Sequence, residues 1–278
     1  MKRREFLAAT AATAAATAAG VMALTRGAIA ADDKPAAKKD IYELRLYKVE
    51  PDTRLKRTFK SDTDARRKRL DAYLGEVMAP ALNRVGISPV GAFESRDGQV
   101  KDVYVLLTHP SAESVTTTTA RLFADEKFVK DGKEYLDLPQ DDPLYTRIES
   151  TMMLAFDGMP KIEAPDTSKA RIFQMRIYES HSMLKGQKKV EMFNGGGEIA
   201  LFRKCGITPV FFGESIVGPI LPNLTYMITF PDTDAQKVAW KKFVDSPEWK
   251  KLSGDPQYKD TVSNITNLEL KPTSYSQV

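Results

Sequence analysis

The sequence is poor in the residue types that build disulfides and metal centres. It contains one cysteine, Cys205, and two histidines, His109 and His181. A single thiol excludes an internal disulfide and a zinc site built from several thiolates. Neither histidine has companion ligands at metal spacing, so we expect no metal site. No Ser-His-Asp or Cys-His grouping is readable either, and the catalytic residues of any reaction stay unknown at this stage.

The chain also lacks a strong charge of one sign. Its 278 residues include 41 basic and 37 acidic ones, a formal net charge of +4. The first 30 residues hold four of the basic and one of the acidic residues, which leaves 37 and 36, a net charge of +1. Nucleic acid binding needs a basic surface, so we expect no nucleic acid partner. No later segment holds about 20 consecutive apolar residues, so we expect no stable membrane insertion.

Residues 1–30 have the pattern of an export signal. They start with basic residues, continue with an Ala/Thr-rich stretch, and end in the Ala-Ile-Ala of residues 28–30, which suits signal-peptide cleavage. The arginine pair at residues 3–4 resembles the twin-arginine signal. This pattern predicts a periplasmic or extracellular protein, with residues 31–40 as a short polar linker. The alternatives are an ordinary secretory leader or a basic tail.

The rest of the chain contains one unit twice. Each copy alternates strand and helix signals in the order βαββαβ, which is the ferredoxin-like split motif. We place the first repeat at 41–157, a linker at 158–169 and the second repeat at 170–278. The matching stretches are IYELRLY (41–47) and IFQMRIY (172–178), GISPVGAFE (86–94) and GITPVFFGE (206–214), and VYVLLTHP (103–110) and LTYMITFP (224–231).

The repeat predicts an α+β fold in which two tandem ferredoxin-like repeats pack sheet to sheet as a pseudo-dimeric α/β barrel. In each repeat two helices cover one face of a four-stranded sheet, and the second repeat offers cover for the other face. We expect the apolar sides of the opening strands to face the helices; these are Tyr42, Leu44, Leu46, Phe173, Met175 and Ile177. The opposite sides then face a shared interior.

The expected interior positions include one arginine and one tyrosine from each repeat. They are Arg45, Tyr47, Arg176 and Tyr178, and around one cavity they would hold a carboxylate or an oxygen-rich aromatic molecule. In the alternative, each arginine pairs with Glu43 or another acid and neutralises a buried seam.

Two further candidates, Glu94 and Glu214, stand at equivalent strand ends. Such a carboxylate acts as a base or balances the arginines, or it is simply solvated.

The strand openings, together with GITPVFFGE (206–214), LPNLTYMITFPD (221–232) and AWKKFVDSPEWKKL (239–252), resemble the NIPSNAP family. The resemblance is clearer in the second repeat, since the first carries a longer insertion around 129–143. It implies the fold of the dimeric α/β-barrel superfamily, which agrees with the repeat. It implies no agreed catalytic motif.

These observations favour an exported NIPSNAP-type protein that binds a small organic molecule in an inter-sheet cavity. One alternative is a cofactor-independent monooxygenase or isomerase of the barrel type, and another is a protein-interaction module without catalysis. We expect no cofactor. Haem stays open, because the resemblance extends to a superfamily that includes haem-degrading enzymes. The sequence leaves the oligomeric state undetermined.

Overall fold

The computed structural model describes residues 38–51 and 58–278. The predicted leader at 1–30 and most of the linker at 31–40 lie outside this part, so export stays a prediction. In the first repeat the elements are β1 (Ile41–Lys48), α1 (Thr63–Ala72), the π-helical turn η1 (Tyr73–Met78), α2 (Ala79–Arg84), β2 (Val90–Ser95), β3 (Val103–His109), α3 (Ala112–Ala124), α4 (Glu126–Asp131), α5 (Lys133–Leu136) and β4 (Arg147–Ala155).

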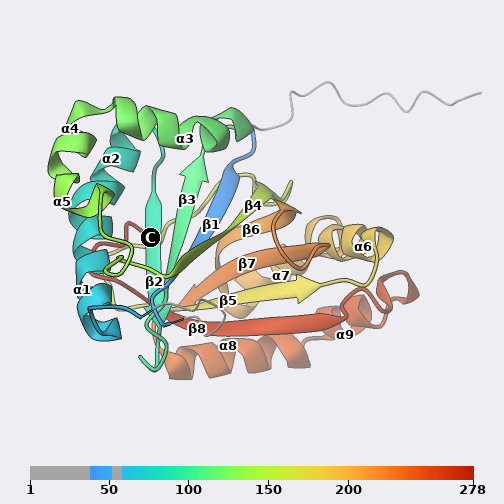
Figure 1. Ribbon diagram of the computed structural model, residues 1–278. Helices are drawn as coiled ribbons and strands as arrows, with labels where there is room; N and C mark the ends of the chain where they lie inside the picture. The colour runs from blue at the N-terminus through green and yellow to red at the C-terminus, as the bar shows by residue number, and fades with distance from the viewer. Residues whose placement is uncertain (1–37, 52–57) are drawn as a thin grey trace, which may run out of the picture. The chain divides into compact units, whose positions relative to one another are not determined.

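The second repeat has the same order of elements. They are β5 (Ile172–Glu179), α6 (Met183–Asn194), α7 (Glu198–Cys205), β6 (Thr208–Val217), β7 (Asn223–Phe230), α8 (Thr233–Asp245), α9 (Pro247–Ser253), the 3-10 turn η2 (Pro256–Tyr258) and β8 (Asn264–Pro272). Figure 1 shows the two sets of strands and helices in chain order.

The eight strands form one closed antiparallel barrel in the order β1-β3-β2-β8-β5-β7-β6-β4. Each repeat supplies four neighbouring strands in the ferredoxin-like order, which confirms the predicted fold class. The two sheets join by their edges. At one seam, β2 pairs with β8 from Phe93↔Pro272 to Ser95↔Leu270. At the other, β4 pairs with β6 from Met152↔Val217 to Ala155↔Gly213, with a register shift.

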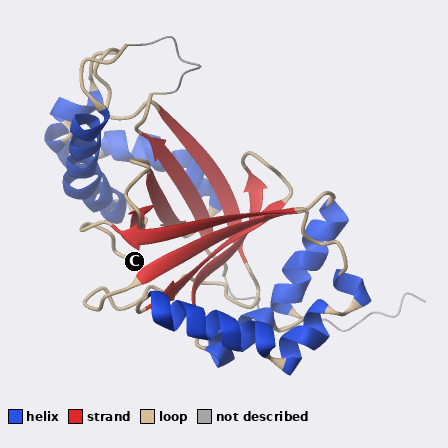
Figure 2. Cartoon of the chain, turned by 90° about the horizontal axis from the view of Figure 1, so that it is seen from below, coloured by secondary structure: helices blue, strands red, loops and turns tan. Residues whose placement is uncertain are grey.

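The helices cover the outside of the barrel in two groups, on opposite sides of the strands (Figure 2). In each group the helix that precedes the second strand ends at a glycine in the left-handed region, Gly86 at φ 76° and Gly206 at φ 87°. Glycine adopts this conformation without steric cost and ends the helix where the chain turns into β2 or β6. Among the described residues, no helix is long and apolar enough to cross a membrane.

The strand faces are the reverse of the expected ones. Tyr42, Leu44, Phe173 and Met175, expected under the helices, belong to one buried apolar cluster that fills the barrel interior. Tyr47 packs instead with α1, η1 and α2. The prediction is wrong because alternation separates two faces without showing which one closes on itself. An eight-stranded barrel is just wide enough for side chains, so its interior takes the face without charges.

Candidate functional site

The four arginine and tyrosine positions predicted to meet in one interior lie on two separate outer faces of the barrel. Tyr47 belongs to the apolar cluster under the helices of the first repeat. Tyr178 belongs to the corresponding cluster of the second repeat. Arg45 and Arg176 are each two residues before their tyrosine, on the same strand face. The structure therefore does not bring the two pairs together.

The expected inter-sheet cavity is filled. Its core consists of side chains that are at most 8% exposed, among them Tyr42, Phe93, Phe173 and Phe211. What remains is a recess of about 150 Å³ at one mouth of the barrel, lined by residues such as Leu44 and Met175. A ligand of drug-like size does not fit there.

A larger cavity lies outside the barrel in the first repeat, between the sheet and the layer of α3, α4 and α5. We call it the first-repeat pocket. Its volume is about 400 Å³, within the range of small-molecule sites. Its described lining is Arg45, Tyr47, Tyr73, Met78, Thr119, Leu122, Phe123, Phe128, Tyr135, Leu136, Leu138, Pro143, Leu144, Tyr145 and Ile148. The pocket thus combines one guanidinium with four phenols on otherwise apolar walls.

Arg45 is held in this pocket by a carboxylate. Its Nε donates to Oε1 of Glu43 at 2.7 Å and its Nη2 donates to Oε2 at 2.9 Å. Ser150 Oγ also donates to Glu43, at 2.8 Å, and Nε2 of the buried His109 lies 3.4 Å from Oε2. The two-pronged pair neutralises the guanidinium, which is the alternative the sequence left open for Arg45.

Two of the phenols near Arg45, those of Tyr47 and Tyr73, have raised pKa values and stay protonated over the ordinary pH range. Burial raises the pKa of Tyr47, although Arg45 acts in the opposite direction. Burial likewise raises the pKa of Tyr73. Buried tyrosines usually find a hydrogen-bond partner, so these hydroxyls are donors for an oxygen atom placed in the pocket.

The second repeat fills the corresponding space with aromatic rings. Both α3 and α8 have 13 residues and begin after a side-chain N-cap, Ser111 and Asp232. Counting from these caps pairs Thr119 with Trp240. In the second repeat the Trp240 ring lies 5.7 Å from that of Phe202, centroid to centroid. In the first repeat Thr119 lines the pocket, so a small side chain leaves open what an indole occupies in the other copy.

Arg176 illustrates the filled version of the site. Its guanidinium carbon lies 5.1 Å from the ring centroids of both Tyr178 and Trp240, an arrangement that favours cation–π attraction. The Tyr178 hydroxyl lies 3.0 Å from that of Tyr226, and Trp240 Nε1 donates to Gln174 Oε1 at 2.7 Å. This side of the barrel is packed rather than hollow around its arginine.

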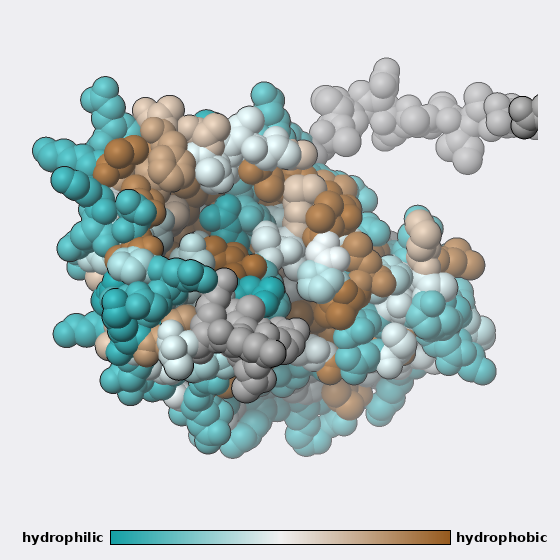
Figure 3. Space-filling view, in the orientation of Figure 1, coloured by the Kyte–Doolittle hydropathy of each residue, from teal (hydrophilic) through white to brown (hydrophobic). Residues whose placement is uncertain are grey.

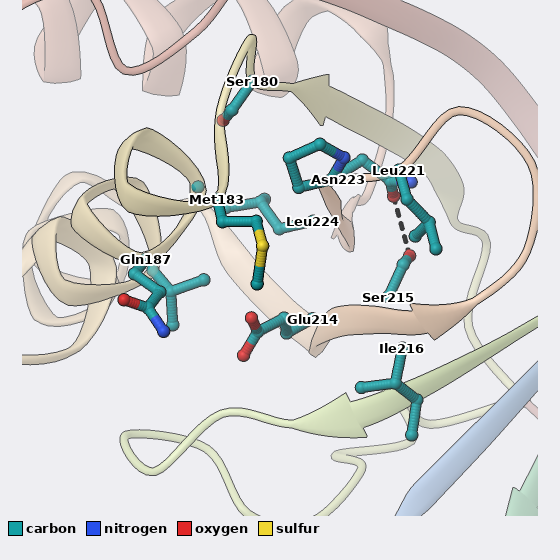
Figure 4. Close-up of a pocket in the computed structure, with 12 residues that line it drawn as sticks. Ser180, Met183, Gln187, Glu214, Ser215, Ile216, Leu221, Asn223 and Leu224 are labelled. Carbon is teal, nitrogen blue, oxygen red and sulfur yellow. Dashed lines mark hydrogen bonds between the residues drawn. The ribbon is translucent and has the colours of Figure 1, made fainter. Parts of the chain in front are cut away.

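The two equivalent glutamates have different surroundings. Glu94 pairs with Arg67 Nη2 at 2.5 Å and with Lys271 Nζ at 3.2 Å, so it belongs to a network of ion pairs. Glu214 lines a separate cavity of about 390 Å³, the second-repeat pocket, between α6 and the ends of β6 and β7 (Figure 4). Of the two predicted acids, Glu214 therefore lies at a cavity and Glu94 is held by cationic side chains.

Sequence reasoning missed several residues of the first-repeat pocket. The sequence indicates no role for Tyr73, Tyr135 or Tyr145, all of which line this pocket. The available signal was the longer insertion around 129–143 in the first repeat, which supplies Tyr135, Leu136 and Leu138 to the wall. An insertion in one of two copies marks where that copy has acquired a feature of its own.

Comparison with known families supports the resemblance seen in the second repeat. The NIPSNAP family model matches residues 173–277, which confirms the family prediction for that part of the chain. No curated protein matches the chain significantly. A NIPSNAP-like domain protein from Burkholderia xenovorans is 19% identical and covers 39% of this chain and 90% of its own length, with a TM-score of 0.35.

Two solved structures resemble almost the whole described chain. A putative monooxygenase from Fusobacterium nucleatum is 12% identical, with a TM-score of 0.53, over 85% of this chain and 93% of its own. A putative monooxygenase from Lactobacillus acidophilus is 13% identical, with a TM-score of 0.51, over 84% and 94%. At this identity the likeness establishes the shared α/β-barrel fold.

Proposed function

We propose, from the premise that residues 173–277 form a NIPSNAP domain within a two-repeat α/β barrel, that the chain binds a small aromatic molecule in the first-repeat pocket. The ligand class is a neutral ring system that carries hydroxyl or keto oxygens. The observation that carries this proposal is the cavity of about 400 Å³ in which four tyrosines surround an arginine already paired with Glu43.

The charge of the site argues for a neutral ligand. A free arginine would favour a carboxylate, but both Nε and Nη2 of Arg45 are committed to Glu43. A carboxylate ligand would have to compete with Glu43 and would leave one buried anion uncompensated. A phenol or ketone makes no such demand. It accepts hydrogen bonds from tyrosine hydroxyls while its ring packs against aromatic and apolar walls.

A monooxygenase reaction in the same pocket is a second proposal. Two structures that share the fold carry that activity in their names, and fold alone does not transfer it. The observation that favours it here is the closeness of protonated phenols to an aromatic cavity, since such donors stabilise developing negative charge on a ring oxygen. Oxygen uptake in the presence of a bound phenol, measured with an oxygen electrode, separates this reaction from binding alone.

Calorimetric titration with three matched probes tests the binding proposal. We expect 2-naphthol to bind at least about tenfold more tightly than 2-naphthoate, because Arg45 is already neutralised by Glu43 and leaves the ligand's carboxylate without a free counter-charge. We also expect it to bind more tightly than naphthalene, which lacks the oxygen. Thr119→Trp places in the first repeat the ring that the second repeat carries at Trp240, and we expect it to abolish naphthol binding.

The control for this substitution is Thr117→Trp, on the same helix at a residue that does not line the pocket. It should leave naphthol binding unchanged. Equal affinity of the wild type and Thr119→Trp for naphthol, or preference for naphthoate, would contradict the proposal. Circular dichroism of each variant shows whether the helices are retained.

A further inference from the structure

We propose that the second-repeat pocket binds small aliphatic primary amines, with Glu214 as the partner of the ammonium group. The described residues that line it are Ser180, Met183, Gly186, Gln187, Val190, Glu214, Ser215, Ile216, Leu221, Pro222, Asn223 and Leu224. This pocket lies in the other repeat from the first-repeat pocket, and the two share no lining residue.

The Glu214 carboxylate lies at the cavity without a counter-charge. Among the residues that the structure describes, it takes part in no hydrogen bond and no ion pair. Figure 4 shows the carboxylate projecting from β6 toward α6, where Met183 and Gln187 face it. A half-buried carboxylate beside apolar groups favours a cationic partner, because the charge is poorly solvated there.

Glu94, the equivalent acid in the first repeat, is neutralised by positive charges that Glu214 lacks among the described residues. Glu94 has two cationic partners, Arg67 from α1 and Lys271 from β8. No described residue fills that role for Glu214, although it occupies the same place in its repeat. The chain therefore satisfies one strand-end carboxylate from within and leaves the other facing a cavity.

The lining of the second-repeat pocket indicates which group is attached to the ammonium of the ligand. Apart from Glu214 the lining residues are mostly apolar, with the buried Leu224, the half-buried Val190 and the exposed Met183 and Leu221. Figure 3 shows apolar side chains gathered between the two helical layers on the face in view. Such a cavity suits an alkyl chain, whose burial removes apolar surface from water.

None of the described lining residues is aromatic, which narrows the chemical class of the cation. Quaternary ammonium groups are recognised by aromatic faces, and this pocket offers none. A primary ammonium carries three N–H donors and suits a carboxylate with nearby amide and hydroxyl oxygens. Among the described residues, no group of three or more acids, histidines or cysteines is placed to hold a metal ion, so the pocket favours an organic cation over a divalent metal.

Gly186 keeps the pocket open from the helix side. A glycine within a helix such as α6 is less favourable for helix stability than an alanine. A Cβ at this position would lie 3.4 Å from the Cβ of Pro222 and 3.8 Å from that of Ser180. These are ordinary contacts, so alanine fits, whereas a longer side chain would extend into the cavity. The residue thus preserves volume at a cost in helix stability.

Titration of the full chain with hexylamine, hexanol and hexanoate at pH 7.5 tests this inference. We expect hexylamine to bind at least about tenfold more tightly than hexanol, with hexanoate the weakest of the three. Glu214→Gln keeps the shape and removes the charge, so hexylamine affinity should fall to that of hexanol. Gly186→Leu should abolish binding of both probes by filling the cavity.

The matched control is Glu94→Gln, the same change at the equivalent acid, and it should leave hexylamine binding as in the wild type. Gly186→Ala should retain hexylamine binding. Together with the loss of binding in Gly186→Leu, this result would show that the loss comes from the filled cavity and not from the replacement of glycine as such. The inference is overturned if hexylamine and hexanol bind equally, if neither binds, or if the two glutamine variants behave alike.

Discussion

At the scale of single residues, Glu43 is a buried carboxylate whose charge is stabilised by its neighbours. Burial by itself would raise its pKa, yet the neighbouring His109, the hydrogen bonds from Arg45 and Ser150 and the charge of Arg45 lower it to about 2. The ionised carboxylate is therefore much better stabilised in the folded chain than in the unfolded one. A carboxyl with a depressed pKa contributes stability above its unfolded value and loses that contribution as the pH falls toward the folded value.

Replacement of this carboxylate tests the argument. Between the ordinary value of 4.5 and about 2, the shift corresponds to roughly 3 kcal/mol. We expect Glu43→Gln to lower the free energy of unfolding by about that amount at pH 7, and the difference from the wild type to shrink as the pH falls from about 4.5 toward 2. Urea unfolding at several pH values measures both. A difference that stays constant down to pH 2.5 would contradict the assignment.

The sequence predicted the contacts between residues that are close together along the chain. Glu43 and Arg45 are two residues apart on one strand, so their pairing follows from the period of a strand. The different fates of Glu94 and Glu214 were not predictable in this way. The partners of Glu94 come from α1 and from β8 of the other repeat, and alternation says nothing about contacts over such sequence separations.

At the scale of elements, α3 and α8 occupy equivalent places in the two repeats but differ in the side chains that they carry. Trp240 on α8 packs on the rings of Phe202 and Phe243 and donates to Gln174. Its counterpart on α3 is Thr119, at the first-repeat pocket. The difference at this one helix position therefore contributes to the contrast between a packed layer and a hollow one.

Trp240→Thr should convert the packed layer into a hollow one. We expect the free energy of unfolding to fall by about 3 kcal/mol, because a large aromatic group is removed from a packed cluster and leaves a cavity. Arg176 would lose one of its two ring contacts. Chemical denaturation gives the loss, and Lys241→Thr, an exposed change on the same helix, should cost less than about 0.5 kcal/mol. If both variants lose a similar amount of unfolding free energy, Trp240 is not a packing residue of this layer.

The elements themselves were largely readable from the sequence, whereas the direction in which strands face was not. Alternation in IYELRLY gave a strand and two faces. The side with Tyr42 and Leu44 was assigned to the helices and lies inside the barrel. The error is physical, since both faces of a barrel strand are covered and both contain apolar side chains.

At the scale of the whole molecule, the segment after β8 ties the repeats together. Thr273 N donates to Ala92 O at 2.9 Å, and Gln277 N donates to Val90 O at 2.9 Å. The Val278 side chain is fully buried in the barrel core, and Tyr275 Oη donates to Asp71 at 2.7 Å. Residues of the second repeat thus complete the edge of the first sheet, where the seam between β2 and β8 is short.

Removal of residues 273–278 should weaken the barrel as a whole. Burial of one valine and one tyrosine side chain contributes on the order of 3–6 kcal/mol, so we expect a loss of that size and a clear fall in melting temperature. Tyr275→Phe removes only the hydrogen bond to Asp71 and should cost about 1 kcal/mol. Calorimetry of both variants provides the comparison. A truncated chain that melts like the wild type would show that the segment is dispensable.

Because this segment is synthesised after the first repeat, its position has a consequence for folding during translation. A chain made from its N-terminus exposes the β2 edge, with Val90 and Ala92 unpaired on that side, from the moment the first sheet forms. Among the residues of the first repeat that the structure describes, none covers that edge, because its partners are β8 and residues 273–277. During translation the first repeat therefore exposes an unpaired strand edge. This edge can pair with other chains until β8 and residues 273–277 have been synthesised.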